Sequence, residues 1–554
     1  MKKTLLIGVS LTLLSVIALN GCTTDKANDS SSSDTQVPQA ANNVNPAGMF
    51  PIVKDKVTMK VLVQANALVE DFATNTFTKQ LEEKTNIHLE WEVVPAKSAQ
   101  EKLNLVLASS DYPDIIMGFA VTPTQQMIFG EQGVFLPLNQ MIDKYSVDFK
   151  KAMEKFPLVK ETITDVRGNI YALPVVNDCF QCSMSQKMYI YKPWLDKLGL
   201  KMPTTTDEFY QVLKAFKEKD PNGNGKADEI PLAGAPAPSG SDIGLFIMNS
   251  FTPYNKSGLI LNNGKIEASF TKPEWKEGLQ YLQKMYADKL ISPQSFTQDT
   301  NQLKQMAENP DIAVLGAAAA NNVSVISQIS GKSGRWLDYV TVPPLKGPKG
   351  VQVAALNPFN ATGGQFIITK ANKNPEAAFR LADYLYSEEA TFPSVNGVEG
   401  KQWKKPGPTD IGLDGKPAKW VELIPFGQVQ NDFWAQSGVF LFDDSIRLSK
   451  AADPNTPNLA YILYKETKEK YEPYKQKVET VVPPLYLTTE QASEMADLNK
   501  TITDYRDEMF VRIVTGDVEL EKGWTDYLKQ LDSMNIKRYL QINQEAYDVK
   551  YKKK

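Results

Sequence analysis

The segment Pro113-Asp114-Ile115-Ile116-Met117-Gly118 predicts a short, fully apolar strand that ends at a glycine. Strands without polar alternation are typical of parallel sheets, because helices cover both faces of such a sheet. Upstream, apolar and polar residues alternate at 57–63 and again at 87–93, with a helical pattern between the two runs. These units predict an open α/β sheet whose ligands bind beyond the carboxyl ends of its strands.

The same rule selects positions that face a ligand. Residues 64–66 follow the first predicted strand, and Gly118 and Phe119 follow the strand of the opening segment. We therefore expect these residues to face a cleft at the edge of the sheet.

A second α/β unit is predicted farther along the chain. The apolar run at 188–191 predicts a strand, and Thr205 with Glu208 matches the spacing of a capping box at a helix start. Apolar residues then recur at helical spacing at 209, 212, 213 and 216. A chain of 554 residues with two such units is expected to form two domains.

The amino terminus predicts export. A charged start precedes an apolar run at residues 5–19, which is shorter than the about 20 residues that a membrane span needs. The run ends in Leu19-Asn20-Gly21-Cys22, which resembles the lipobox of bacterial lipoproteins. We expect residues 1–21 to be a signal peptide and Cys22 to carry acyl chains that anchor the protein to the outer face of the cell membrane. An unmodified cysteine after a plain secretory signal is the alternative.

Residues 22–49 are rich in Ser, Asn, Ala, Asp and Pro and contain almost no large apolar side chains. Such a segment cannot bury enough surface to offset the entropy of ordering its chain. It is therefore expected to be a disordered linker between the lipid anchor and the folded body.

The composition excludes several kinds of chemistry. The chain has 61 Lys and Arg against 65 Asp and Glu, which argues against nucleic acid as a partner. His88, the single histidine, lies in an alternating run and is expected to point outward, which excludes Ser-His-Asp catalysis and His-ligated zinc. A surface glycosidase or lyase with two carboxylates about 5 to 10 Å apart remains an alternative to a binding protein.

Two cysteines stand close together in a polar stretch. Cys179 and Cys182 form a Cys-Phe-Gln-Cys sequence in a chain that is expected to be exported. This pattern favours a structural disulfide or two unreactive thiols over a redox centre.

The segment DPNGNGKADEIP at 220–231 predicts a Ca²⁺ loop. Side-chain oxygens stand at loop positions 1, 3, 5 and 9 around a turn-forming glycine, on Asp220, Asn222, Asn224 and Asp228. The Lys226 carbonyl suits position 7, and Glu229 at position 10 supplies a further carboxylate. The loop departs from an EF-hand at position 12, which is Pro231. A calcium-free turn rich in Asx residues is the alternative.

Several segments together resemble the family 1 extracellular solute-binding lipoproteins, which are the sugar-binding subunits of ABC importers. They are the lipobox and linker, PDIIMG at 113–118, and the segments at 187–232, 502–517 and 523–547. The resemblance covers essentially everything after residue 50, and the loop at 220–229 is similar to the calcium loop of the alginate-binding proteins. It implies a monomeric receptor that captures an oligosaccharide and delivers it to ABC permease subunits.

The resemblance also implies a type II fold like that of the maltose-binding and alginate-binding proteins. Two α/β lobes are joined by crossing segments and close on the ligand by hinge motion. Crossings are expected near residues 173–176, 342–345 and 395–425. The expected lobes are residues 51–175 with 343–397, and 176–342 with 398–554, the latter including a helical tail.

Sugar sites combine aromatic platforms with planar amide and carboxylate groups. Trp434 and Trp403 lie in irregular, polar sequence and are the predicted platforms, with Phe433 beside the former. Further candidates for ligand contact are Asn66, Phe119, Asp178, Asn321 and Glu399. The alternative for each tryptophan is that it anchors a loop in the core. A receptor that signals or adheres without transport is a third class of function.

Overall fold

The structure is a computed structural model that describes residues 43–236, 240–329, 331–359, 361–424, 427–452 and 457–552. The expected signal peptide, Cys22 and most of the expected linker lie outside the described residues. In the part of the chain that the structure describes, no helix combines the length and the apolar character that a membrane crossing requires.

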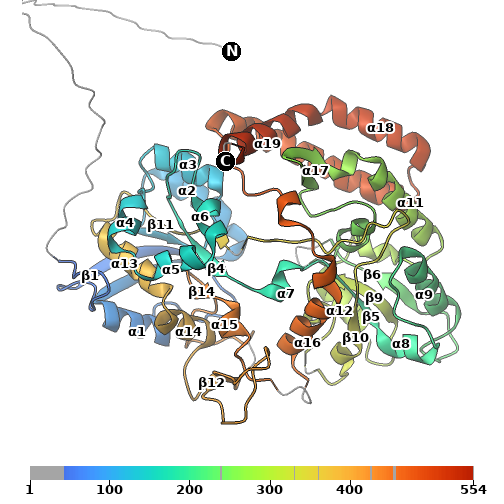
Figure 1. The fold of residues 1–554 in the computed structure, drawn as a ribbon, viewed down its shortest axis with the longest axis horizontal. Helices are drawn as coiled ribbons and strands as arrows, with labels where there is room; N and C mark the ends of the chain where they lie inside the picture. Colours follow the sequence, from blue (N-terminus) through green and yellow to red (C-terminus); the bar gives the residue numbers. More distant parts are fainter. Residues whose placement is uncertain are drawn as a thin grey trace, which may run out of the picture. The chain divides into compact units, whose positions relative to one another are not determined.

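The first lobe is built on a six-stranded sheet in the order β14-β4-β11-β3-β1-β2 (Figure 1). Its strands are β1 (Val57–Gln64), β2 (Ile87–Val94), β3 (Ile115–Met117), β4 (Leu173–Asn177), β11 (Ala361–Ile368) and β14 (Leu441–Phe442). β1 is parallel to β2 and β3, β14 is parallel to β4, and β11 is antiparallel to β3 and β4. The carboxyl ends of all strands except β11 therefore meet at one edge of the sheet.

Helices cover both faces of this sheet. They are α1 (Thr76–Thr85), α2 (Ala99–Ser109), α3 (Pro123–Glu131), α4 (Asn139–Tyr145), α5 (Asp148–Lys155), α6 (Pro157–Ile163), α13 (Pro375–Leu385), α14 (Glu388–Asn396) and α15 (Asp444–Arg447). Within β3, Ile116 packs in the cluster that contains α2, whereas Ile115 and Met117 pack in the cluster that contains α1 and α13. Burial on both faces explains why this strand has no polar residue, as the sequence predicts.

The second lobe contains a four-stranded sheet in the order β10-β5-β9-β6. Its strands are β5 (Lys187–Tyr191), β6 (Ile230–Ala233), β9 (Leu315–Ala320) and β10 (Tyr339–Val342), and a hairpin of β7 (Leu259–Asn262) and β8 (Lys265–Ala268) packs nearby. β6 is parallel to β9, and β5 is antiparallel to β9. The carboxyl ends of β6 and β9 therefore lie at the same edge as the start of β5.

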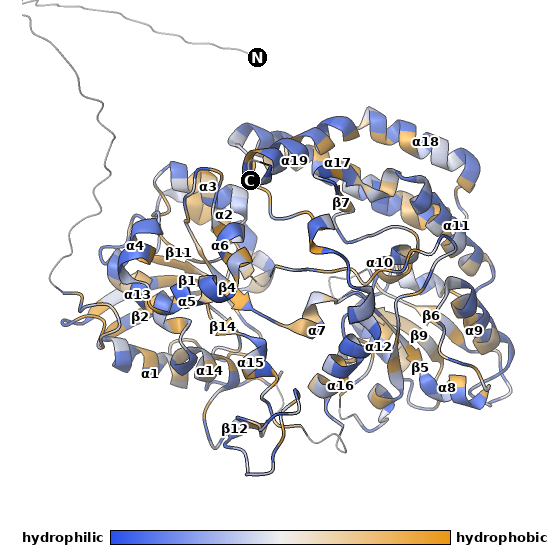
Figure 2. Ribbon diagram, viewed as in Figure 1, coloured by the Kyte–Doolittle hydropathy of each residue, from blue (hydrophilic) through white to orange (hydrophobic). Residues whose placement is uncertain are grey.

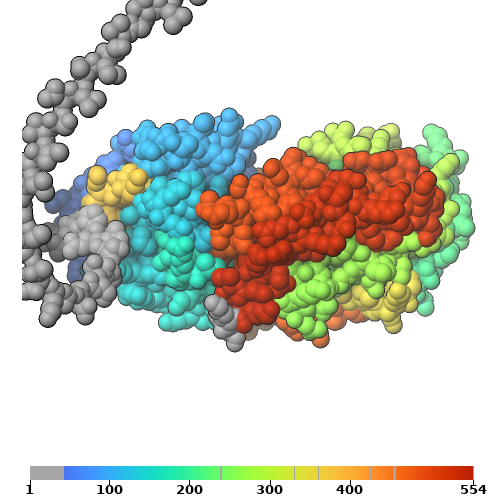
Figure 3. Space-filling view, turned by 90° about the horizontal axis from the view of Figure 1, so that it is seen from above, coloured from blue at the N-terminus to red at the C-terminus, as the bar shows by residue number. Residues whose placement is uncertain are grey.

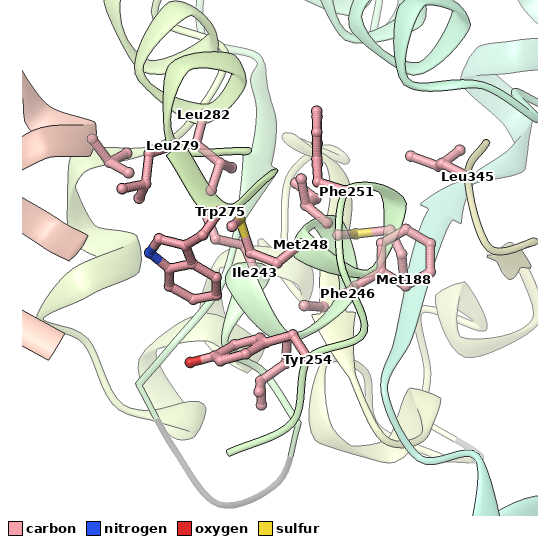
Figure 4. Close-up of a cluster of buried hydrophobic side chains, with 14 of the residues drawn as sticks. Met188, Ile243, Phe246, Met248, Phe251, Tyr254, Trp275, Leu279, Leu282 and Leu345 are labelled. Carbon is pink, nitrogen blue, oxygen red and sulfur yellow. The ribbon is translucent and has the colours of Figure 1, made fainter. Parts of the chain in front are cut away.

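The helices of the second lobe pack around two apolar clusters. They are α8 (Lys192–Lys197), α9 (Thr206–Glu218), α10 (Ile243–Ile247), α11 (Pro273–Ala287), α12 (Thr300–Ala307), α16 (Leu459–Glu466), α17 (Thr489–Thr515), α18 (Leu520–Ser533) and α19 (Ile536–Tyr551). The predicted capping box of Thr205 and Glu208 is present at the start of α9. Figure 4 shows part of the core, where Trp275 packs against Tyr254 with ring centroids 4.5 Å apart. Figure 2 shows hydrophobic strands and helices of mixed hydropathy, as this packing requires.

Three segments cross between the sheets. The first runs from β4 through α7 (Phe180–Ser183) to β5, the second links β10 to β11, and the third links α15 to α16. The carboxyl-terminal helices, red in Figure 3, also contact the first lobe, where α17 meets α3. Just before α17, the Tyr486 hydroxyl donates to the Thr162 carbonyl at 2.8 Å.

The third crossing corrects the expected lobe boundary at residue 398. Trp434 and Val439 pack in the core of the first lobe, and β14 pairs with β4. The segment from 398 to α15 therefore extends the first lobe, including the small ladder of β12 (Trp403–Lys404) and β13 (Val421–Glu422). Two-residue strands in irregular sequence leave no periodic pattern, which is why the sequence did not reveal this boundary.

Candidate ligand-binding site

A polar pocket of 290 Å³ lies at the carboxyl ends of β1 and β3. Its volume is near the lower end of ligand pockets, about 300 Å³. The residues that line it come from four separate parts of the chain: Gln64, Ala65, Asn66, Ala67, Gly118, Gln365, Gln436, Ser437 and Gly438. The pocket thus lies at the sheet edge where the sequence predicts a cleft, and residues 64–66 and Gly118 are among its walls.

One wall of the pocket is a backbone turn at 435–438 in a left-handed conformation. Ala435 has φ 49°, Gln436 has φ 69° and Gly438 has φ 79°. A Cβ atom at Gly438 would lie 3.0 Å from the Met117 sulfur, so only glycine fits there without a shift. Alanine and glutamine at positive φ are strained, and strained backbone of this kind clusters at functional sites.

Asn66 holds this turn in place. Its amide nitrogen donates to the Ala435 carbonyl and to the Ser437 hydroxyl, both at 3.0 Å. Its amide oxygen accepts from the Leu68 N–H at 2.9 Å. Because all these groups are engaged within the protein, Asn66 shapes the pocket wall through its side chain.

Trp434 is not the exposed platform that the sequence suggests. The ring is 1% exposed, and its indole N–H donates to the Thr78 hydroxyl at 2.8 Å. It packs edge-on against Phe77 and Trp91, at centroid distances of 4.9 and 5.6 Å. A buried ring cannot stack on a sugar in this conformation, so Trp434 instead anchors the turn that follows it.

Two other predicted contact residues are also buried. Phe433 is 7% exposed, and Phe119 is 6% exposed and packs in the core beneath β3. Asn321, at the carboxyl end of β9 in the second lobe, accepts from the Asn322 side chain at 2.9 Å. The structure does not bring these residues together with Asn66 in the polar pocket.

Trp403 and Glu399 share a different pocket. It has a volume of 510 Å³ and is lined also by Glu388, Glu389 and Asp432. The Trp403 indole N–H donates to the Gly397 carbonyl at 3.0 Å, and its ring meets Phe392 edge-on at 4.8 Å. The contact residues predicted from the sequence therefore lie at two separate pockets, Asn66 at the polar pocket and Trp403 and Glu399 at this one.

Three glutamine side chains line the polar pocket, and none of them is among the side chains that the sequence predicts to contact ligand. Among the described residues, the amides of Gln64 and Gln436 have no hydrogen-bond partner, and Gln365 makes a weak bond of 3.4 Å to the Gly363 carbonyl. Gln64 lies inside the segment that the strand rule selected. No sequence signal marks the other two, because they enter the pocket from β11 and from the left-handed turn.

Carboxylates gather farther along the same sheet edge, after β4 and β14. Asp443 forms an ion pair with Lys155, and Arg447 lies 3.8 Å from Asp444 and donates to the Asn177 side chain at 2.5 Å. Burial, and then the neighbouring Asp178, raise the pKa of Asp444 to about 6. Burial also raises the pKa of Asp178. This end of the edge is acidic.

The first crossing segment carries a disulfide between Cys179 and Cys182, whose Cα atoms lie 5.2 Å apart. Lys187, 1% exposed, donates to the Gln181 carbonyl at 2.9 Å and to the Met184 carbonyl. Its ammonium group therefore satisfies carbonyls at the end of α7, and burial lowers its pKa to about 7.

The loop at 220–231 folds back on its own backbone. The Asp220 carboxylate accepts from the N–H groups of Gly223 and Gly225 at 2.8 and 2.9 Å. The amides of Asn222 and Asn224 donate to Asp228 at 2.7 and 2.8 Å. One buried oxygen of Glu229 has no hydrogen-bond partner in the described structure. Across the described ranges, no three His, Cys, Asp or Glu side chains are grouped as a metal cluster.

Two α/β lobes joined by crossing segments, with a polar pocket at a sheet edge, define a type II solute-binding protein. Residues 62–392 match the family model described as bacterial extracellular solute-binding protein, and the chain belongs to this family.

Curated relatives cover nearly the whole chain. It is 28% identical over 514 residues to the fructooligosaccharide ABC transporter substrate-binding protein FusA of Streptococcus pneumoniae, covering 90% of this chain and 91% of FusA. It is 25% identical over 485 residues to the polygalacturonan/rhamnogalacturonan-binding protein YtcQ of Bacillus subtilis, covering 85% of this chain and 87% of YtcQ. These relatives are binding proteins, and the protein is accordingly a solute-binding protein and not an enzyme.

Solved structures agree with this assignment. FusA of S. pneumoniae in complex with kestose has a TM-score of 0.73 and 26% identity, and covers 90% of this chain and 100% of that structure. A solute-binding protein from Bifidobacterium longum infantis that binds HMO shares the fold with a TM-score of 0.74 at 24% identity, covering 89% and 99% of the two chains.

Proposed function

We propose that this protein captures an oligosaccharide outside the cell and delivers it to the permease of an ABC importer. The observation that carries the proposal is the polar pocket, where Gln64, Gln365 and Gln436 present amides to the space at the sheet edge. Amides both donate and accept hydrogen bonds, as neighbouring sugar hydroxyls do. Membership of the family and the likeness to FusA, named for fructooligosaccharide, support the same function.

Capture would proceed by hinge closure. The three crossing segments would bend so that the edge of the second sheet, with Asn321, approaches the polar pocket. Asp178 lies on the first crossing and is proposed to face the ligand there. Trp403 and Glu399 remain proposed contacts for a long ligand that extends to the second pocket.

The protein is further proposed to be a monomer that is tethered through acyl chains on Cys22. The sequence around Cys22 supports the anchor, and the relative LipO of Bacillus subtilis, 28% identical over 342 residues, is named as a lipoprotein. Two acyl chains would hold the folded body at the membrane through the linker.

The loop at 220–231 is proposed to bind a structural Ca²⁺ ion. Asp220, Asn222, Asn224, Asp228 and Glu229 supply side-chain oxygens, and Lys226 supplies its carbonyl. The buried oxygen of Glu229 has no hydrogen-bond partner in the described structure, and such an oxygen suits a cation ligand, because it is costly to bury otherwise. A FusA structure described as an EF-hand mutant supports the proposal.

Isothermal titration calorimetry tests the function. The mature chain with Cys22→Ala is titrated with kestose and with oligosaccharides of other linkages, in Ca²⁺. We expect at least one glycan to bind with a single site, and the products recovered after incubation to be unchanged on chromatography. Release of shorter glycans would contradict a binding protein, and heat from no glycan would contradict the sugar assignment.

A further inference from the structure

We infer that the ligand is an uncharged glycan and that the site rejects chains that carry uronic acids. This inference rests on the proposed function and narrows the class of ligand. It depends on three regions: the polar pocket, the acidic end of the same sheet edge, and the facing edge of the second sheet.

The polar pocket offers nothing that would neutralise an anion. Among the described residues that line it, none carries a charged side chain. A carboxylate that loses water needs a cation or several hydrogen-bond donors in return, and Arg is the usual partner in protein sites. A uronate bound here would have neutral amide donors but no cationic partner.

The amides in the pocket are suited to neutral hydroxyl groups instead. Gln64 and Gln436 have no hydrogen-bond partner among the residues the structure describes, and Gln365 keeps a 3.4 Å bond to Gly363. Each amide presents one acceptor oxygen beside two donor hydrogens. A carboxylate can accept from the amide donors but has no hydrogen to give to the amide oxygens, whereas a hydroxyl can do both.

The neighbouring end of the sheet edge repels anions. Asp178 and Asp444 follow β4 and β14, whose carboxyl ends lie at the same edge as those of β1 and β3. The two cations of this group are already engaged, Lys155 by Asp443 and Arg447 by Asp444 and Asn177. Three carboxylates therefore stand against two cations, and a polyuronate that extends from the pocket toward this end meets like charge.

The described residues at the edge of the second sheet do not offset this negative charge. It presents Asn321 and Asn322 after β9. Lys187 begins β5 at the same edge, but it is buried and donates to the Gln181 and Met184 carbonyls. Its charge is thus directed into the crossing segment and away from a ligand.

A matched pair of glycans tests the inference by calorimetry on the mature Cys22→Ala chain in Ca²⁺. Kestose and other neutral trisaccharides are compared with trigalacturonate and a mannuronate trimer. We expect a neutral trisaccharide to bind at least 100-fold more tightly than either uronate. Uronate binding that equals the best neutral glycan would overturn the inference and leave the proposed receptor function standing. Failure of every glycan, with a normal cooperative melt, would overturn both.

A charge variant identifies the source of the rejection. Asp444→Asn removes one carboxylate from the acidic end, and Asp497→Asn, on the exposed face of α17, is the matched control. We expect Asp444→Asn to narrow the ratio of uronate to neutral dissociation constants by about two- to threefold, as the loss of one partly screened charge predicts. The control should leave the ratio unchanged. An equal ratio in both variants would remove the acidic end from the explanation.

Discussion

The polar pocket and the loop at 220–231 differ in how their polar side chains are hydrogen-bonded. In the loop, Asp220 and Asp228 accept hydrogen bonds from N–H groups within the same twelve residues of sequence. In the pocket, Gln64 and Gln436 lack partners among the described residues, although more than 350 residues separate them in the chain. The loop can therefore form most of its hydrogen bonds from local sequence, whereas the amides of the pocket come together only in the folded chain and are left available for a ligand.

The two regions also differ in what holds them in shape. The loop is held by its own backbone hydrogen bonds, and the pocket by a core residue and a strained turn. Trp434 anchors that turn from below, and Asn66 ties it from the side. Damage to the core should therefore reach the pocket and leave the loop intact.

The largest expected effect is that of Trp434→Ala. Truncation of a fully buried tryptophan lowers the free energy of unfolding by about 3 to 5 kcal/mol. Urea unfolding should show this loss, and calorimetry should show that glycan binding is lost while Ca²⁺ binding persists. For the stability measurement alone, Trp403→Ala, at a half-buried ring, is the matched control and should cost less than half as much. Retained glycan affinity in Trp434→Ala would show that the pocket does not depend on this anchor.

We expect Ca²⁺ to stabilise the folded protein by binding at the loop at 220–231. At 100 times its dissociation constant, an ion that binds only the folded state adds about 2.7 kcal/mol of stability. We expect Ca²⁺ to raise the melting temperature of the mature chain after chelator treatment, and Asp220→Ala to abolish the shift. Asp207→Asn, exposed on α9, is the control. A chelated chain that melts at the same temperature with and without Ca²⁺ would leave the loop as a calcium-free turn.

Lys187 differs from both the pocket and the loop, because its amine is buried and donates to backbone carbonyls. Burial lowers its pKa to about 7 in the folded protein, whereas the unfolded chain keeps the ordinary value near 10.4. Between these values the unfolded state binds more protons, so the stability contribution rises with pH, by up to about 1.4 kcal/mol per pH unit. Urea unfolding at pH 7, 8 and 9 should show a steeper rise in the wild type than in Lys187→Met. Parallel curves would contradict a lowered pKa.

The smallest effect is expected at the strained turn. Gln436→Gly relieves the cost of positive φ and should raise the free energy of unfolding by about 0.5 to 1 kcal/mol. Gln436→Ala keeps the strain and should leave stability within about 0.5 kcal/mol of the wild type. Both variants should weaken glycan binding, because both remove the amide. Unchanged affinity in the pair would remove Gln436 from the site.

Several parts of the fold were predicted correctly from the sequence, and one lobe boundary was not. The apolar strand at 115–117 and the capping box at Thr205 were predicted correctly, because each depends on neighbours within a few residues. The strand rule also placed residues 64–66 and Gly118 at the correct edge. The boundary at 398 was wrong, because β14 joins the first sheet through long-range pairing that no local pattern records.

The burial of Trp434 could not be predicted from the sequence. Irregular sequence around Trp434 is compatible with an exposed platform and with a core anchor, and the choice depends on whether Phe77 and Trp91 enclose the ring. Gln365 and Gln436 could not be singled out for the same reason, since their role comes from the segments that meet around them.

By itself, the sequence determined the α/β class, the candidate calcium loop and the sheet edge that carries the pocket, because periodicity, caps and turns are local properties of the chain. The tertiary structure alone decided which polar side chains are left without partners and which rings are buried. Burial and hydrogen-bond satisfaction depend on contacts between residues far apart in sequence, and these are fixed only when the chain has folded.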